Sequence, residues 1–119
     1  MSGCGRERRS STLFELLSPQ ATSVTFANEL PEKPDFNILN YLYYYNGGGV
    51  AVGDVNGDGL PDLYFTSNLG PNKLYITKGN YTFEDVTDRA GVRGIEGWTT
   101  GVTMADVNGA GKRDSYVAG

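Results

Sequence analysis

Carboxylate and amide side chains alternate along one short stretch of this sequence, residues 46–65, which read NGGGVAVGDVNGDGLPDLYF. Asp54, Asn56 and Asp58 stand at every second position, and Asp62 follows four residues later. Two carboxylates about 4 Å apart repel each other by roughly 1 kcal/mol in water and by roughly 4 kcal/mol at an effective dielectric near 20. A tight loop that holds three carboxylates therefore either stays open and solvated or closes around a cation.

The donor atoms of this loop are hard oxygens, which are the ligands that calcium prefers. The alternating spacing of D-x-N-x-D-G-x-x-D predicts that Asp54, Asn56 and Asp58 point toward one ion. The carbonyl of Leu60 is the predicted fourth ligand, and Asp62 completes the shell directly or through water. Magnesium is disfavoured because it takes fewer protein ligands and more waters.

Two other interpretations of this loop were weighed against a calcium loop in a β protein. An EF-hand or dockerin loop begins identically, but it needs an acidic residue at position 12 and a helix afterwards. Position 12 is Phe65, and the residues that follow the loop, LYFTS, have the composition of a strand. The remaining interpretation is a solvated Asp/Asn/Gly turn without an ion. Three carboxylates at such short spacing favour the metal site for this first loop.

A second copy of the pattern follows 52 residues later. GVAVGDVNGDGLPDLYF aligns without a gap with GVTMADVNGAGKRDSYV, and the ligand positions conserved in the second copy are Asp106, Asn108 and Asp114. Ala110 stands where the first copy has Asp58, and two cations, Lys112 and Arg113, are added. We therefore expect the second loop to bind a divalent ion far more weakly than the first, or not at all.

Length and composition limit the classes of protein to which the chain can belong. Its 119 residues suffice for one modest domain, and its net charge is −4. A negative chain lacks the positive field that a phosphate-binding face needs, which argues against nucleic acid as the main partner. The sequence has no histidine and one cysteine, so imidazole-based triads, intrachain disulfides and CxxC zinc sites are excluded. Seventeen glycines and eight tyrosines indicate turn-rich β structure.

The N-terminus differs in composition from the rest. Residues 1–12 are short of apolar side chains and rich in charge and serine, so we predict a disordered leader there and a repeat region over residues 13–119. The opening MSGC resembles the end of a bacterial lipoprotein signal, in which the cysteine is lipidated. Cys4 is therefore either a lipid anchor or a free cysteine. No apolar run is long enough to span a membrane.

Short apolar segments between turn residues predict the order of the elements. Residues 13–17 are expected to form a helical turn or a short strand that Ser18 and Pro19 terminate. A helical turn is expected within residues 87–98. The predicted strands are 23–30, 37–45, 49–53, 63–67, 73–78, 81–86 and 100–104. Gly79 and Asn80 are predicted to form the hairpin turn that joins 73–78 to 81–86. Short strands with a repeat near 50 residues predict the four-stranded blades of an all-β propeller.

The motifs also carry a family resemblance. Residues 46–68 resemble the FG-GAP/VCBS repeat, the calcium-loop blade of integrin α-subunit propellers and of many secreted bacterial proteins. The wider pattern, which includes NKLYITKGNYTFEDVTDRAGV and WTTGVTMADVNG, is similar to the repeat region of bacterial relatives of the cartilage acidic protein, a group often associated with an ASPIC/UnbV domain. The resemblance covers roughly residues 13–119.

This resemblance implies a partial β-propeller of about two blades, calcium in the blade loops and an extracytoplasmic or cell-surface location. Carried over residue by residue, the implied ligands are Asp54, Asn56, Asp58, Leu60 and Asp62 in the first loop and Asp106, Asn108 and Asp114 in the second. Ala110 departs from the pattern and puts the second site in doubt. A partial propeller leaves blade edges open, so edge-to-edge association of the chain is also expected.

The function predicted from these features is a non-enzymatic, calcium-binding module that binds an extracellular protein or glycan. The alternative is a fragment of a propeller hydrolase or lyase that acts on extracellular polysaccharide, with its active site outside this chain. A third interpretation is a calcium-dependent scaffold with no ligand of its own. The sequence shows no catalytic pair of nucleophile and base. Glu96 and Trp98 are compatible with a sugar-binding patch, although a loop tryptophan is more often a packing anchor.

Overall fold

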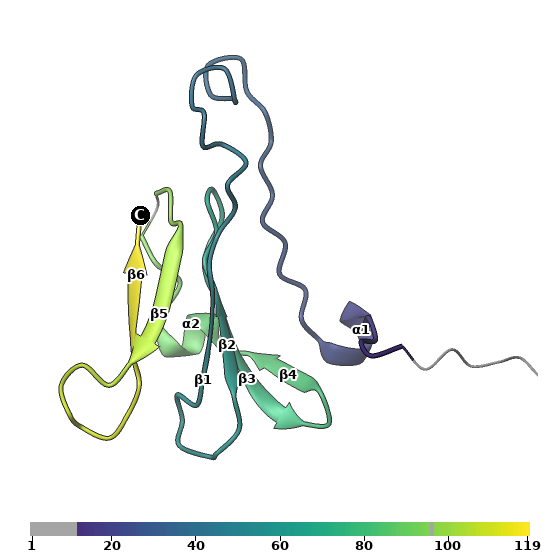
Figure 1. The fold of residues 1–119 in the computed structure, drawn as a ribbon, viewed down its shortest axis with the longest axis vertical. Helices are drawn as coiled ribbons and strands as arrows, with labels where there is room; N and C mark the ends of the chain where they lie inside the picture. The colour runs from purple at the N-terminus through teal and green to yellow at the C-terminus, as the bar shows by residue number, and fades with distance from the viewer. Residues whose placement is uncertain (1–11, 96) are drawn as a thin grey trace, which may run out of the picture.

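The computed structural model describes residues 12–95 and 97–119, which form two antiparallel sheets and two short helices (Figure 1). The predicted lipidation of Cys4 and most of the predicted leader lie outside the described residues. The elements, in chain order, are α1 (Pro19–Thr22), β1 (Val50–Gly53), β2 (Asp62–Phe65), β3 (Lys73–Gly79), β4 (Thr82–Asp85), α2 (Thr87–Ala90), β5 (Gly101–Ala105) and β6 (Asp114–Ala118). The all-β prediction is confirmed, and the strands of the described residues make two sheets rather than a closed ring.

The first sheet is a simple meander in the order β1-β2-β3-β4. Val52 pairs with Leu63, and Leu63 pairs in turn with Tyr75. A two-residue turn at Asn80 and Tyr81, both with positive φ (55° and 58°), joins β3 to β4. Such turns match the right-handed twist of the strands that they connect, so the predicted hairpin is confirmed, with its turn one residue later than the predicted Gly79-Asn80.

The second sheet is the hairpin β5-β6, and the main core lies between it and the first sheet. The buried residues of this core are Tyr64, Leu74, Ile76 and Val86, and Val102, Met104 and Val117 of the hairpin pack against them. The strands β1 and β5 lie side by side (Figure 1). A side chain at Gly49 would bring its Cβ to 2.9 Å from the Val102 nitrogen, so the close approach of the sheets requires glycine there.

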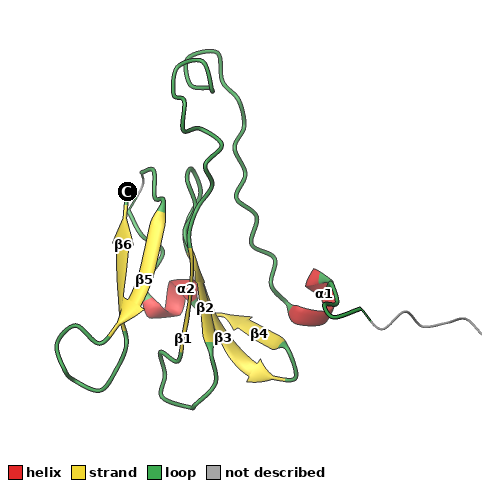
Figure 2. Ribbon diagram, in the orientation of Figure 1, coloured by secondary structure: helices red, strands yellow, loops and turns green. Residues whose placement is uncertain are grey.

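The tyrosine-rich segment 37–45, predicted as a strand, forms consecutive turns instead (Figure 2). Its carbonyls accept from amides three residues later, as in the bond from the Tyr44 nitrogen to the Tyr41 oxygen at 3.1 Å. Asn37 draws the chain into the first turn, because its side-chain oxygen accepts from the Leu39 nitrogen at 2.9 Å. The prediction was wrong because these aromatic rings pack against one another and Trp98 and not across a sheet.

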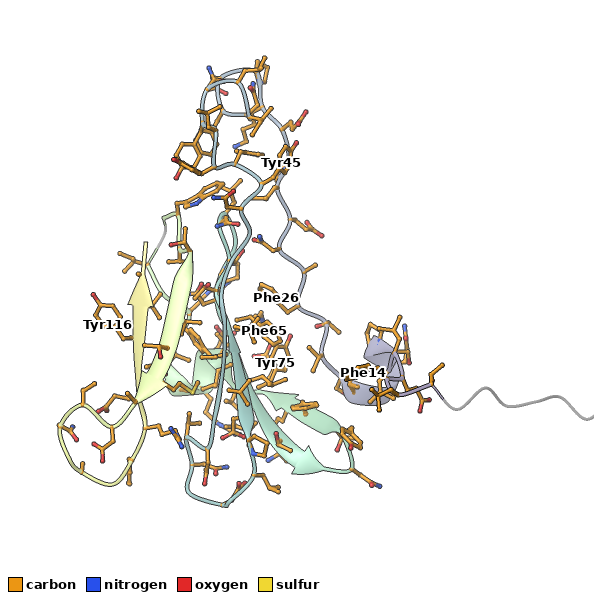
Figure 3. All side chains as sticks on the ribbon, viewed as in Figure 1. Phe14, Phe26, Tyr45, Phe65, Tyr75 and Tyr116 are labelled. Carbon is orange, nitrogen blue, oxygen red and sulfur yellow. The ribbon has the colours of Figure 1, made fainter. Side chains whose placement is uncertain are left out.

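The strand predicted over residues 23–30 is also absent, although its alternation is real. The segment is extended and pairs with no strand in the described part of the chain, yet Val24 and Phe26 are half-buried and their neighbours are exposed. Phe26 stacks on Phe65 with ring centroids 4.9 Å apart (Figure 3). Asn28 donates to the Asn68 side chain at 2.7 Å. The segment therefore packs on the open face of the first sheet through side chains.

Near the N-terminus, Ser18 and Pro19 begin a helix where a stop was predicted. The Ser18 hydroxyl accepts from the Ala21 nitrogen at 3.2 Å, and Pro19 occupies the first helical position. Both are favourable choices for a helix start, because serine caps the free amides and proline has no amide to lose. Residues 13–17, predicted as a helical turn or strand, adopt neither and are exposed.

Candidate functional site: the two acidic loops

The two acidic loops occupy equivalent places in the fold. One connects β1 to β2 and the other connects β5 to β6, and both lie at the same end of the sheets (Figure 2). The aromatic segment 31–46 lies at the opposite end (Figure 1). The sequence repeat is thus a structural repeat, and its two copies stand next to each other.

Asp54 organises the backbone of the first loop. Its carboxylate accepts from the Gly57 nitrogen at 2.7 Å, the Gly59 nitrogen at 2.8 Å and the Asp58 nitrogen at 3.2 Å. Gly57 and Gly59 both have a φ of 82°, which aims these amides inward and which other residues rarely adopt. The pKa of Asp54 is lowered below its ordinary value of 3.8, chiefly because the Gly59 amide donates to the carboxylate. Loss of hydration raises the pKa, and the remaining amides of the loop lower it further.

Asn56 and Asp58 form the exposed rim of the same loop. The side-chain nitrogen of Asn56 donates to Asp58 Oδ2 at 2.9 Å, and the backbone nitrogen of Leu60 donates to Asp58 Oδ1 at 2.8 Å. The Asn56 side-chain oxygen accepts from the Asp58 nitrogen at 2.9 Å. Because an ionised carboxylate offers about four lone-pair positions, Asp58 keeps acceptor capacity beyond these bonds.

Asp62 connects the loop to the sheet. Its side chain is fully buried, with Oδ2 accepting from the Val55 nitrogen at 3.0 Å and Oδ1 accepting from the Thr77 nitrogen at 2.9 Å. The contact with β3 was not anticipated from the sequence, since Thr77 is fifteen residues away and belongs to a different hairpin. The side chain of Asp62 in β2 therefore closes the loop and joins it to β3.

The second loop reproduces this hydrogen-bond frame. Asp106 accepts from the nitrogens of Ala110 and Gly111 at 3.0 and 2.8 Å, and Asp114 accepts from the Val107 nitrogen at 3.2 Å. The Gly111 amide is the main cause that lowers the pKa of Asp106. The Asn108 oxygen accepts from the same Ala110 nitrogen at 2.9 Å. The second loop therefore keeps the backbone hydrogen bonds to its aspartates, but it has Ala110 where the first loop has the Asp58 carboxylate.

The donor set of the first loop fits calcium by its chemistry, since every predicted ligand is an oxygen. In the described residues, however, no three acidic, histidine or cysteine side chains gather closely enough to hold a metal ion. The carboxylates of Asp54, Asp58 and Asp62 instead accept hydrogen bonds from the loop and the sheet. The structure therefore defines a prearranged acidic loop, and its calcium occupancy remains a prediction.

Trp98 lies at the opposite end of the molecule, among aromatic side chains. Its ring meets those of Phe36 and Tyr41 nearly at right angles, with centroids 5.6 and 5.4 Å apart. The hydroxyl of the buried Tyr44 donates to the Pro31 carbonyl at 2.8 Å and fixes the loop above it. This is the geometry of a packing anchor. Glu96, its predicted partner in a sugar patch, lies outside the described residues.

The family can be named at this point. The profile of the FG-GAP-like repeat family matches residues 54–117, more than half of the chain, and the chain belongs to this family. The match begins at the first acidic position and ends in β6, so it includes both loops and every strand except β1.

The chain is also similar to cartilage acidic protein 1 from three vertebrates. It is 37% identical to the Xenopus tropicalis protein, 38% to that of Mus musculus and 37% to that of Homo sapiens, in each case over 71 residues. These residues are 60% of this chain and 11% of each relative, so the match spans about a tenth of the relatives' length. No solved structure matches the chain significantly. Among the helices that the structure describes, none has the length and apolar character needed to cross a membrane.

Proposed function

We propose that this chain is a non-enzymatic, calcium-binding module of an extracellular or cell-surface repeat protein, which binds a protein or glycan partner. The observation that carries the proposal is the prearranged first loop, in which three carboxylates stand on a backbone frame that the second loop repeats. Membership of the FG-GAP-like repeat family supports a binding role. The similarity to cartilage acidic protein 1 supports the extracellular location.

The residues that would hold calcium are those of the first loop: the side chains of Asp54, Asn56, Asp58 and Asp62 and the carbonyl of Leu60. A bound calcium supplies positive charge, which offsets the mutual repulsion of the carboxylates. Backbone amides of the loop and of β3 already bind both oxygens of Asp54 and of Asp62, so the ion would have to share these carboxylates with them. Asp58 is exposed and accepts one hydrogen bond on each oxygen. In the second loop, Asp106, Asn108 and Asp114 would offer a weaker site, because Ala110 contributes no oxygen from its side chain.

Equivalent apolar side chains are buried in one repeat and exposed in the other, which supports a propeller-like arrangement of blades. Val102 and Met104 of β5 pack against the core of the first sheet. Their counterparts 52 residues earlier, Val50 and Val52, are 56% and 59% exposed. The exposed face of β1 is therefore suited to pack against a further sheet in the way that β5 packs against the first, as neighbouring blades do.

Thermal unfolding followed by circular dichroism tests the calcium site. We expect the midpoint to rise along a calcium series relative to excess chelator, and the Asp58→Ala variant to lose this rise. Extracellular calcium modules typically have dissociation constants of roughly 0.1–1 mM. At a free calcium concentration tenfold above that constant, one site adds about 1.4 kcal/mol to the free energy of unfolding.

Asp35→Ala is the matched control, because it removes one exposed carboxylate outside both loops. It should keep the full calcium response. If the unchanged chain melts cooperatively and calcium does not move its midpoint, the metal assignment is wrong. An equal loss of response in both variants would assign the effect to net charge and not to the loop.

A further inference from the structure

Three asparagines of the sequence are followed directly by glycine: Asn46, Asn56 and Asn108. Such pairs are chemically labile, because glycine has no side chain to keep its backbone nitrogen away from the asparagine side-chain carbonyl. The three glycines that follow all have positive φ, and a Cβ added at any of them would meet no atom within 4 Å. Space and backbone conformation are therefore alike at the three pairs, so a difference in reactivity has to come from hydrogen bonding.

In the first acidic loop, both reacting groups are already engaged. The Gly57 nitrogen donates to Asp54 Oδ1 at 2.7 Å. The Asn56 side-chain nitrogen donates to the Asp58 carboxylate, and the Asn56 side-chain oxygen accepts from the Asp58 nitrogen, both at 2.9 Å. Attack of the Gly57 nitrogen on Asn56 would first have to break a hydrogen bond to an ionised group, which is stronger than one between neutral groups.

The second acidic loop holds its pair in a similar way. The Asn108 side-chain oxygen accepts from the Ala110 nitrogen at 2.9 Å. The Gly109 amide is among the hydrogen-bond donors that lower the pKa of Asp106. Both acidic loops therefore engage their labile pair through the same arrangement of aspartate and backbone amides.

The third pair lies at the end of the aromatic segment 31–46, away from the acidic loops (Figure 1). The Asn46 side chain is exposed, and within residues 12–95 and 97–119 neither it nor the Gly47 nitrogen has a hydrogen-bond partner. The backbone on either side is held, because the Asn46 nitrogen donates to the Tyr43 oxygen and the Gly47 oxygen accepts from the Asn68 side chain, each at 3.0 Å. The two reacting groups are thus free on an anchored backbone.

We infer that the Asn46-Gly47 pair is a self-modification site, at which the chain converts asparagine to isoaspartate with water as the only co-reactant. The Gly47 nitrogen attacks Asn46 Cγ and forms a new carbon–nitrogen bond, and the side-chain amide leaves as ammonia with the proton of the Gly47 nitrogen. Water then opens the resulting succinimide ring on one side or the other, which gives isoaspartate or aspartate. The net change converts one amide and one water into one carboxylic acid and one ammonia. This inference goes beyond the proposed function and does not depend on calcium.

Isoaspartate lengthens the main chain by one methylene group, directly before a closely fitted stretch. A side chain at Gly48 would collide with the Thr66 backbone oxygen, and the Gly49 nitrogen donates to the Thr66 hydroxyl at 2.6 Å. The aromatic segment that precedes this stretch packs on Trp98, with the Tyr44 ring centroid 5.6 Å from that of the indole. Because the stretch that follows cannot absorb the extra length, the modification should shift the aromatic segment relative to Trp98.

The rates of the three pairs within one chain test the inference. The 119-residue chain is incubated in chelator at mildly alkaline pH, and tandem mass spectrometry follows the change from amide to acid at each asparagine. In the folded chain we expect Asn46 to convert more than about tenfold faster than Asn56 and Asn108, because only the loop pairs must first break charge-assisted hydrogen bonds. In urea, where those bonds are lost, the three rates should be similar. Enzymatic methylation of isoaspartate identifies the product.

A variant of the first loop tests the protective hydrogen bond directly. Asp54→Ala frees the Gly57 amide, so the conversion of Asn56 should accelerate toward the rate of Asn46, whose own rate should stay the same. If this variant fails to fold, the three rates in the unchanged chain decide. Conversion of Asn56 or Asn108 as fast as that of Asn46 in the folded chain, or no conversion at Asn46, would overturn the inference.

The fluorescence of Trp98, the only tryptophan of the chain, measures the shift of the aromatic segment. The chain that carries isoaspartate at residue 46 is separated by chromatography, and its emission should be shifted to the red. Asn46→Asp is the matched control, because it adds the same charge without the methylene group, so its emission should equal that of the unmodified chain. Equal emission of the isoaspartate chain and the unmodified chain would overturn the link between the modification and the aromatic segment.

Discussion

At the scale of single residues, each acidic loop is built around one aspartate whose carboxylate collects backbone amides. Asp54 and Asp106 each accept from the amides four and five residues later, and the second of these amides is the main cause that lowers the pKa of each. The loops differ at their rim, where Asp58 has become Ala110. The stabilisation of an ionised aspartate by backbone amides should therefore occur in both loops. Ion binding that needs the Asp58 carboxylate should occur only in the first.

The frame predicts how stability depends on pH. Because folding lowers the pKa of Asp54 and Asp106 below 3.8, their ionised forms stabilise the folded chain above that pH. This contribution is lost as the pH falls below 3.8 through the lower folded values. In chelator, the thermal midpoint should drop between about pH 5 and about pH 3. The drop should be smaller in the double variant Asp54→Asn, Asp106→Asn.

Other carboxylates keep part of the pH dependence in that variant, such as Glu84, whose pKa the Lys78 ammonium lowers through a hydrogen bond. The test therefore compares how steeply the thermal midpoint falls with pH in the parent chain and in the double variant. Identical slopes for the parent chain and the double variant would show that the amide frame does not stabilise ionised aspartate.

The rim predicts a gain of function in the second loop. Ala110→Asp restores the third carboxylate on a frame that is already present, so this variant should show a larger calcium-dependent rise in thermal midpoint than the parent chain. Lys112 and Arg113 remain beside the loop and should keep the gain below the roughly 1.4 kcal/mol of one well-occupied site. Terbium luminescence provides a second readout of ion binding. A variant that responds like the parent would show that the second loop is not a diminished copy of the first.

At the scale of elements, the repeat uses equivalent side chains in different ways. Tyr64 in β2 is 4% exposed, and its hydroxyl donates to the Val92 carbonyl at 2.7 Å. Its counterpart Tyr116 in β6 is 69% exposed. The difference follows from what covers each sheet. The hairpin and Val92 pack against the first sheet, whereas nothing in the described part of the chain covers the outer face of the hairpin at Tyr116.

This difference predicts opposite outcomes for two matched substitutions. Tyr64→Phe should lower the free energy of unfolding by about 1 kcal/mol, because it removes a buried hydrogen bond and leaves the Val92 carbonyl without that donor. Tyr116→Phe should leave stability almost unchanged. Urea unfolding of both variants measures the effect. Equal losses would contradict the burial that the structure assigns to the two strands.

A buried polar network joins elements that are far apart in the sequence. The Asn68 side chain donates to the carbonyls of Gly47 and Thr99 at 3.0 Å each and accepts from Asn28. Asn72 accepts from the Ser67 nitrogen and from the Thr99 hydroxyl, both at 2.9 Å. These bonds satisfy polar groups that would otherwise be costly to bury. The network therefore fixes the N-terminal segment and the connection to the same end of the first sheet.

At the scale of the whole molecule, the distance between the two sheets depends on glycine. Gly49→Ala would place a methyl group 2.9 Å from the Val102 nitrogen and 3.1 Å from the Thr100 oxygen. Both are backbone atoms of the second repeat, so the sheets must separate. We expect a loss of about 1–3 kcal/mol in the free energy of unfolding, as for other overpacked cores.

Gly101→Ala is the matched control at the equivalent position. There the nearest atom is the Ala118 Cβ at 3.9 Å, which is an ordinary contact. Its effect on stability should stay within about 0.5 kcal/mol in the same denaturant titration. A larger loss at residue 101 than at residue 49 would mean that the sheets do not pack through β1 and β5.

The sequence by itself determined the features that depend on local rules. The repeat of 52 residues, the acidic loops, the hairpin at Asn80 and the strands β1 to β5 follow from spacing, turn residues and alternation, which act between near neighbours. The helix start at Ser18 was equally local, but Pro19 was taken as a stop although proline is favoured at the first helical turn.

Only the tertiary structure decided the features that depend on distant partners. Residues 37–45 have strong β propensity, yet they form turns because their rings pack around Trp98, more than fifty residues away. Residues 23–30 alternate as a strand does, yet they pack through Phe26 and Asn28 without pairing. In the candidate site, spacing identified Asp62 as a ligand, and only the sheet showed that it also accepts from Thr77. Propensity favours an extended backbone, and the available partners decide whether that backbone joins a sheet.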